Sequence, residues 1–181
     1  MMQLLETHPT GETAKSAEPL QATLVELIDL SLQAKQAHWN VVGPSFKAIH
    51  LFLDELTDQY RDWYDEVAER LAAIGVSPDG RIATLGAGTP LEPLPAGQLR
   101  DQDVLAFFET RVTLVADRVR ARLDPLGAHD LSARISSSAS CTGSTSSAGC
   151  CAPTARDRRR RATARGGPAG HPDPPRAPGA P

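Results

Sequence analysis

The chain has 181 residues, a length that suits one domain. Its net charge of −3 combines two unlike parts: residues 1–131 carry 11 Lys and Arg against 20 Asp and Glu, whereas residues 132–181 carry 8 Arg against 2 Asp. A transmembrane helix and a signal peptide are not expected, since no apolar run reaches 18 residues and the N-terminus lacks a basic region followed by an apolar one. All three cysteines lie in the second part, so the cysteine-free body fits a reducing cytoplasm.

Composition and pattern divide the chain into three segments. Residues 1–18 are polar and mixed, and we expect a flexible tail there. Residues 19–131 carry helical patterns and form the expected bundle domain. Residues 132–181 are rich in Arg, Pro, Ser and Gly and are expected to be disordered, because they have almost no aliphatic side chains with which to bury a core.

The first helix is predicted from Leu20 to about Val42, where apolar residues recur with helical spacing on more than one side. Gly43 suits the C-terminal end of this helix, and Pro44 suits the first turn of the next one. A second helix is predicted from about Ser45 to Ile74, because its apolar residues follow a spacing of three and four over some thirty residues.

A long connection rich in Pro and Gly follows over residues 76–99, with room for one short turn of helix. A third helix is predicted from about Asp101 to Leu123, and Pro125 with Gly127 ends it. No segment alternates with period two for long enough to predict a strand. The pattern therefore indicates an all-α fold, an antiparallel bundle with one longer link, in which a fourth helix is expected after residue 130.

The expected fourth helix is lost or replaced in this sequence, because it starts near residue 129 and then gives way to SSSASCTGSTSSAGCC. Such an abrupt change resembles GC-rich coding DNA read out of frame. Joining the third base of each codon to the first two of the next, from Arg134 to Pro153, permits the amphipathic string DLLIGVVHRLDKQRWMLRA. We therefore hypothesise a frameshift after about residue 132; the alternative is a genuine basic tail, and sequencing the locus through codon 132 distinguishes them.

Acidic and imidazole side chains lie on the second predicted helix in two pairs, each spaced four residues apart. The pairs are His50 with Asp54 and Asp65 with Glu69, and His38 lies at the end of the preceding helix. At 100° per residue, the four positions on the second helix fall within an arc of about 100° and share one face. A mixture of imidazoles and carboxylates suits iron better than zinc or magnesium.

One straight helix cannot bring both pairs to a single ion, because Asp54 and Asp65 are separated by roughly 16 Å along the axis. Positions 50 with 69, and 54 with 65, share one midpoint between Gln59 and Tyr60. A second copy of the helix, antiparallel about a two-fold axis at that midpoint, would place each pair against the opposite pair of its partner. The spacing predicts two equivalent metal sites shared across a dimer; the alternative is solvated charge on a surface helix.

The segment KQAHWNVVGPSFKAIHLFLDELTDQYRDWYDEVAER, residues 35–70, strongly resembles the Dps family, the ferritin-like DNA-binding proteins from starved cells. The family's pattern of H-W-N, Gly and Phe, then H-x-x-x-D and D-x-x-x-E, is matched at every ligand position, and the wider similarity runs from about residue 20 to residue 130. The permitted out-of-frame string looks like the family's last helix.

The resemblance implies a four-helix subunit that assembles into a hollow dodecamer with ferroxidase centres between two-fold-related subunits. His38, His50 and Asp54 are then iron ligands from one subunit, and Asp65 and Glu69 are iron ligands from the other. Family members oxidise Fe(II), preferably with hydrogen peroxide, and store ferric mineral, which protects the cell and its DNA from oxidative damage; some also bind DNA.

Trp39 is adjacent to His38 in the sequence and could donate electrons to a stray oxidant, although ordinary interface packing is an equally good explanation. Two further functions compete with iron oxidation. One is compaction of DNA by a nucleoid-associated protein with little ferroxidase activity, which requires a basic arm such as residues 156–161. The other is an inactive frameshifted product that does not assemble.

Overall fold

The computed structural model describes residues 11–128, 131–133 and 135, and three long helices account for most of them. Helix α1 spans Gly11–Asn40, α2 spans Phe46–Ala73 and α4 spans Asp101–Leu123. A seven-residue helix, α3, spans Ile82–Gly88, and a 3-10 turn, η1, spans Asp124–Leu126. The expected all-α fold class is therefore confirmed.

The first helix begins earlier than its apolar pattern predicts. Residues 11–18, where a flexible tail is expected, are the first turns of α1. Lys15 and Glu18 are exposed there, whereas Leu20 is the first fully buried position. Residues 11–18 have no large apolar side chain, so they leave no apolar periodicity in the sequence, which explains the wrong boundary. The rest of the predicted tail, residues 1–10, lies outside the described residues.

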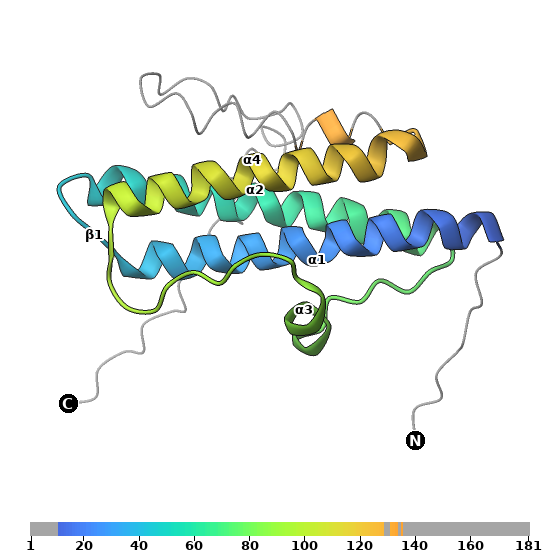
Figure 1. The fold of residues 1–181 in the computed structure, drawn as a ribbon, viewed down its shortest axis with the longest axis horizontal. Coiled ribbons are helices and arrows are strands. Elements are labelled where there is room, and N and C mark those ends of the chain that lie inside the picture. The colour runs from blue at the N-terminus through green and yellow to red at the C-terminus, as the bar shows by residue number, and fades with distance from the viewer. Residues whose placement is uncertain (1–10, 129–130, 134, 136–181) are drawn as a thin grey trace, which may run out of the picture. The chain divides into compact units, whose positions relative to one another are not determined.

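The long helices pack side by side, with α1 antiparallel to α2 (Figure 1). The connection between α2 and α4 leads the chain back along the bundle, so α4 runs in the same direction as α2. At one end of the bundle the strand β1, Val41–Val42, pairs in parallel with β2, Leu99–Arg100. This two-residue pair is too short to have a sequence signal of its own, and it joins the α1–α2 turn to the start of α4.

A buried carboxylate fixes the same turn. Asp101, the first residue of α4, accepts a hydrogen bond through Oδ2 from the backbone N–H of Ser45 at 2.7 Å. Gly43 has φ +141°, and a Cβ built on it would lie 2.4 Å from Cγ of Asp101. Only glycine leaves room for the carboxylate at this point. The turn therefore sets how the end of α1 meets the beginning of α2.

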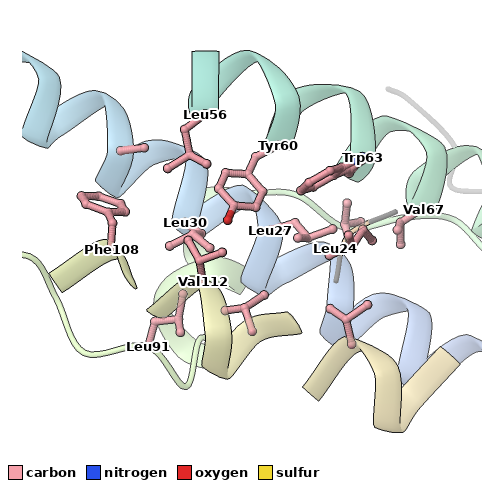
Figure 2. Packing of buried hydrophobic residues seen from close by; sticks show 14 of the residues in the cluster. Leu24, Leu27, Leu30, Leu56, Tyr60, Trp63, Val67, Leu91, Phe108 and Val112 are labelled. Carbon is pink, nitrogen blue, oxygen red and sulfur yellow. The ribbon is translucent and has the colours of Figure 1, made fainter. Parts of the chain in front are cut away.

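The core lies between the three long helices, and Figure 2 shows its centre. Leu27 and Leu30 of α1, Tyr60 of α2 and Phe108 of α4 point toward one another there. The long connection also contributes, because Leu91 reaches the same cluster. These side chains bury most of the apolar stripe of each helix, and that burial is the main source of the bundle's stability.

One carboxylate within the bundle is paired with two cations. Glu26 of α1 is fully buried, and its two oxygens accept hydrogen bonds from Arg118 and Arg122 of α4. A buried carboxylate is tolerated only when it is paired and hydrogen-bonded, so these contacts also fix the register of α1 against α4.

The chain continues beyond η1 with helical residues at 131–133 and 135, of which Leu131, Ser132 and Ile135 are buried. The remainder of the expected basic tail, residues 136–181, lies outside the described residues, as does most of the segment to which the frameshift hypothesis applies. Among the described residues, none of the helices has the length and apolar character that a membrane crossing requires.

Candidate metal centre

The α1–α2 turn brings together His38, His50 and Asp54, three of the five predicted ligands. His38 occupies the last turn of α1, and the other two lie on the first half of α2. Because the helices are antiparallel, the end of α1 faces the beginning of α2. The His38 Nδ1 atom lies 3.4 Å from Oδ1 of Asp54. Three predicted ligands separated by up to 16 positions are thus gathered at one end of the hairpin.

The two imidazoles hold each other in place. Their rings stack with centroids 3.5 Å apart and an interplanar angle of 23°. Nδ1 of His38 lies 2.9 Å from the carbonyl oxygen of His50, and Nδ1 of His50 lies 3.0 Å from the carbonyl oxygen of His38. A carbonyl oxygen can only accept, so each Nδ1 carries the proton and each Nε2 keeps a lone pair for a metal ion.

Phe46 supports this arrangement from the start of α2. Its ring centroid lies 4.9 Å from that of His50, so His50 has an aromatic neighbour besides His38. His38 is 7% exposed, and His50 is partly buried. Since imidazole ligands must present Nε2 in a defined direction, rings fixed by hydrogen bonds and stacking are suited to binding a metal ion without rearrangement.

Asp54 is ionised and engaged by a lysine that the sequence analysis did not single out. Lys35 of α1 donates a hydrogen bond through Nζ to Oδ1 of Asp54. This hydrogen bond holds the pKa of Asp54 below its ordinary value of 3.8; His38 and His50 act in the same direction, and desolvation opposes them. Lys35 could have been found from its spacing, because it lies one turn before His38 on the same helix.

Asp65 and Glu69, the other predicted ligands, are exposed on the second half of α2. The structure does not bring them to the histidines within one chain, as their distance along the helix requires. Within residues 11–128, 131–133 and 135, no three His, Cys, Asp or Glu side chains are grouped so as to hold a metal ion. Within a single chain the five predicted ligands therefore lie in two separate groups of imidazoles and carboxylates, side chains of the types that iron accepts.

A groove of about 810 Å³ is lined in part by Lys35, the partner of Asp54, although His38, His50 and Asp54 do not line it themselves. Trp39, which is 68% exposed, and Lys35 line it from α1, and Thr57, Arg61 and Tyr64 line it from α2. The three α2 residues lie on either side of the predicted two-fold midpoint near position 59.5. The groove was not predicted, because it is formed by side chains that are remote in sequence, including some from α3 and the connection after it.

Comparisons with known proteins agree with the fold. Residues 17–121 match the ferritin-like domain family. The DNA protection during starvation protein 2 of Deinococcus radiodurans is 40% identical over 114 residues, covering 63% of this chain and 47% of the relative. The fine tangled pili major subunit of Haemophilus ducreyi is 44% identical over 93 residues, covering 51% and 49%.

A solved structure, Dps92 of Deinococcus radiodurans, superposes with a TM-score of 0.66 at 34% identity, covering 74% of this chain and 82% of that one. The chain spans about half the length of the first two curated relatives, 47% and 49% respectively. The similarity covers the helices that position the candidate ligands, since most of α1, all of α2 and most of α4 fall within residues 17–121.

Proposed function

Because the chain belongs to the Dps family of ferritin-like proteins, we propose that it oxidises Fe(II) at dinuclear sites between two subunits and stores the ferric product. The observation that carries this proposal is the mutual fixation of His38 and His50 beside Asp54, with both Nε2 atoms available. Asp65 and Glu69 are exposed farther along α2, out of reach of the histidines of their own chain. Their exposure supports the proposal that a partner subunit completes the site.

The proposed ligands divide the chemistry between them. The Nε2 atoms of His38 and His50 bind Fe(II) directionally, whereas the carboxylates of Asp54, Asp65 and Glu69 stabilise the additional charge of Fe(III). With hydrogen peroxide as oxidant, each of two Fe(II) ions loses one electron. The peroxide O–O bond breaks, and with two protons its oxygens leave as two water molecules. We also propose that Trp39, which is exposed and adjacent to His38 in the sequence, reduces a stray oxidant.

Assembly follows from the shared site. We propose a two-fold dimer within a hollow dodecamer, in which the interior holds the ferric mineral. The exposed Trp39 and the groove beside it support the two-fold contact, because an exposed aromatic next to a groove is typical of a protein interface. Removing Fe(II) and peroxide together would protect DNA, the role in the names of several relatives.

An anaerobic Fe(II) titration followed by addition of peroxide tests the proposal. The wild-type chain should bind Fe(II) and consume peroxide rapidly, and His50→Ala and Asp54→Ala should each reduce Fe(II) affinity about tenfold or more, since each removes a ligand. Asp58→Ala is the matched control, because Asp58 is an exposed carboxylate on the same helix outside the proposed ligand set. Equal oxidation by all four proteins would contradict the proposal.

DNA compaction is the second candidate function, since several relatives are named DNA protection during starvation proteins and direct binding is one way to protect DNA. It predicts a gel shift that weakens steeply with salt, because phosphate neutralisation dominates such binding. A salt-dependent shift without peroxide-driven Fe(II) oxidation would favour this function. Oxidation without a shift would favour the iron enzyme, and the absence of both activities would identify the chain as an inactive product.

A further inference from the structure

Lys35 is a cation already paired with one oxygen of Asp54, a proposed metal ligand. Its Nζ is bonded to Oδ1 of Asp54, the same oxygen that lies 3.4 Å from Nδ1 of His38. A carboxylate oxygen engaged by an ammonium group cannot give the same lone pair to a metal ion. The cation already present and the incoming one therefore compete for Asp54.

The ion pair is built into the hairpin. Lys35 comes from α1 and Asp54 from α2, and the two side chains are 29% and 45% exposed. The negative charge of the carboxylate is therefore already balanced by a neighbouring ammonium group before any metal ion arrives.

The ammonium group of Lys35 has space to move away from Asp54. It lines the groove of about 810 Å³ together with Gln36, Trp39 and Tyr64, so its ammonium group can leave Asp54 and remain in contact with water. A lysine has a flexible stem of four carbons and a strongly hydrated head group, which makes such an exchange feasible without movement of either helix.

We propose that Lys35 is a displaceable counter-ion of Asp54, which stabilises the carboxylate before metal binds and lowers the affinity of the half-site for Fe(II). This inference rests on the proposed function, because it assumes that Asp54 is a ligand. It goes further in making Lys35 a determinant of metal affinity. Removing a residue that merely supports the fold should weaken metal binding, whereas removing Lys35 should strengthen it.

The test is a titration of the full-length, metal-free protein with Co(II), a stable divalent ion whose visible absorption reports coordination. Lys35→Met should bind Co(II) about fivefold more tightly than wild type. This factor is the largest that we expect from removing a partly exposed ion pair that competes with the metal ion. Lys35→Arg, which keeps the charge, should bind like wild type. Lys35→Gln provides a second uncharged variant should Lys35→Met fail to fold, as judged by circular dichroism.

Arg61→Met is the matched control, because Arg61 lines the same groove and carries the same charge but forms its ion pair with Asp58. Equal tightening by Arg61→Met and Lys35→Met would mean a general effect of charge and would overturn the proposal. Unchanged or weaker binding by both uncharged Lys35 variants would also overturn it, while the proposed function would stand. If wild-type binding is absent, or is unaffected by Asp54→Asn and His50→Ala, both proposals fail together.

Discussion

At the scale of single residues, the candidate site is prepared by groups other than its ligands. Each histidine carbonyl fixes the imidazole of the other histidine, and Phe46 lies beside His50. Lys35 orients and neutralises Asp54. The proposed ligands themselves are a prediction from residue type and spacing. The contacts that hold these side chains in place could not be predicted, because backbone carbonyls have no sequence signal and the Lys35–Asp54 contact depends on how two helices pack.

Asp79 shows a similar dependence on its neighbours and leads to a prediction about pH. Its carboxylate accepts hydrogen bonds from Arg81 and Thr84, and those from Arg81 are the main reason that its pKa lies far below the ordinary 3.8. The backbone of Asp79 is bonded in turn to the side chain of Gln21 on α1. The residue therefore joins the connection to the bundle.

A carboxyl whose pKa is lowered by folding stabilises the folded state above the unfolded-state pKa and loses that contribution as pH falls toward the folded-state value. We expect Asp79→Asn to lower the melting temperature at pH 6–7, and the difference from wild type to shrink below about pH 4. Asp103→Asn, which removes an exposed carboxyl from the first turn of α4, is the control. A difference that stays constant from pH 7 to pH 3 would contradict this account.

At the scale of elements, the sequence was most informative where a helix buries a continuous stripe. Helix α4 spans the predicted Asp101–Leu123, and α2 differs from its prediction by one residue at each end. The prediction failed at the start of α1, where exposed turns have no apolar pattern, and at β1 and β2, which are two residues long. Short pairings and exposed turns depend on tertiary contacts that a local pattern does not contain.

The α1–α2 turn is the element on which the site geometry depends most. Gly43→Ala would place a methyl group 2.4 Å from Cγ of Asp101 in a conformation, φ +141°, that alanine avoids. We expect a loss of about 1–3 kcal/mol in the free energy of unfolding, measured by urea denaturation. Gly86→Ala is the matched control, because Gly86 lies in α3 with open space at its Cβ position.

The control substitution should be neutral or stabilising by up to about 1 kcal/mol, since alanine has the higher helix propensity. If the two alanine variants unfold at the same urea concentration, the close approach of Asp101 to the turn is not a constraint on the fold. If Gly43→Ala is the less stable, it should also bind Co(II) more weakly, because the turn sets the distance between the two histidines.

At the scale of the whole molecule, the proposal requires two chains. One set of proposed ligands joins His38 of α1 to the first half of α2, and the other lies on the second half of α2. Among the described residues no single-chain grouping can hold a metal ion. The two-fold arrangement is a prediction from sequence alone, because it follows from ligand spacing on a straight helix. The groove beside Trp39 could not be inferred, because α1, α2 and the connection each contribute only part of its wall.

The most direct test of the shared site is complementation between two inactive chains. His50→Ala damages the first set of ligands and Glu69→Ala damages the second, so neither variant alone can form a complete site. When the two are co-expressed and pair at random, about a quarter of the sites should be intact, because half of the dimers are mixed and each has one complete site. We predict recovery of about a quarter of the wild-type rate of peroxide-driven Fe(II) oxidation. A mixture no more active than either variant alone would contradict a site built from two subunits.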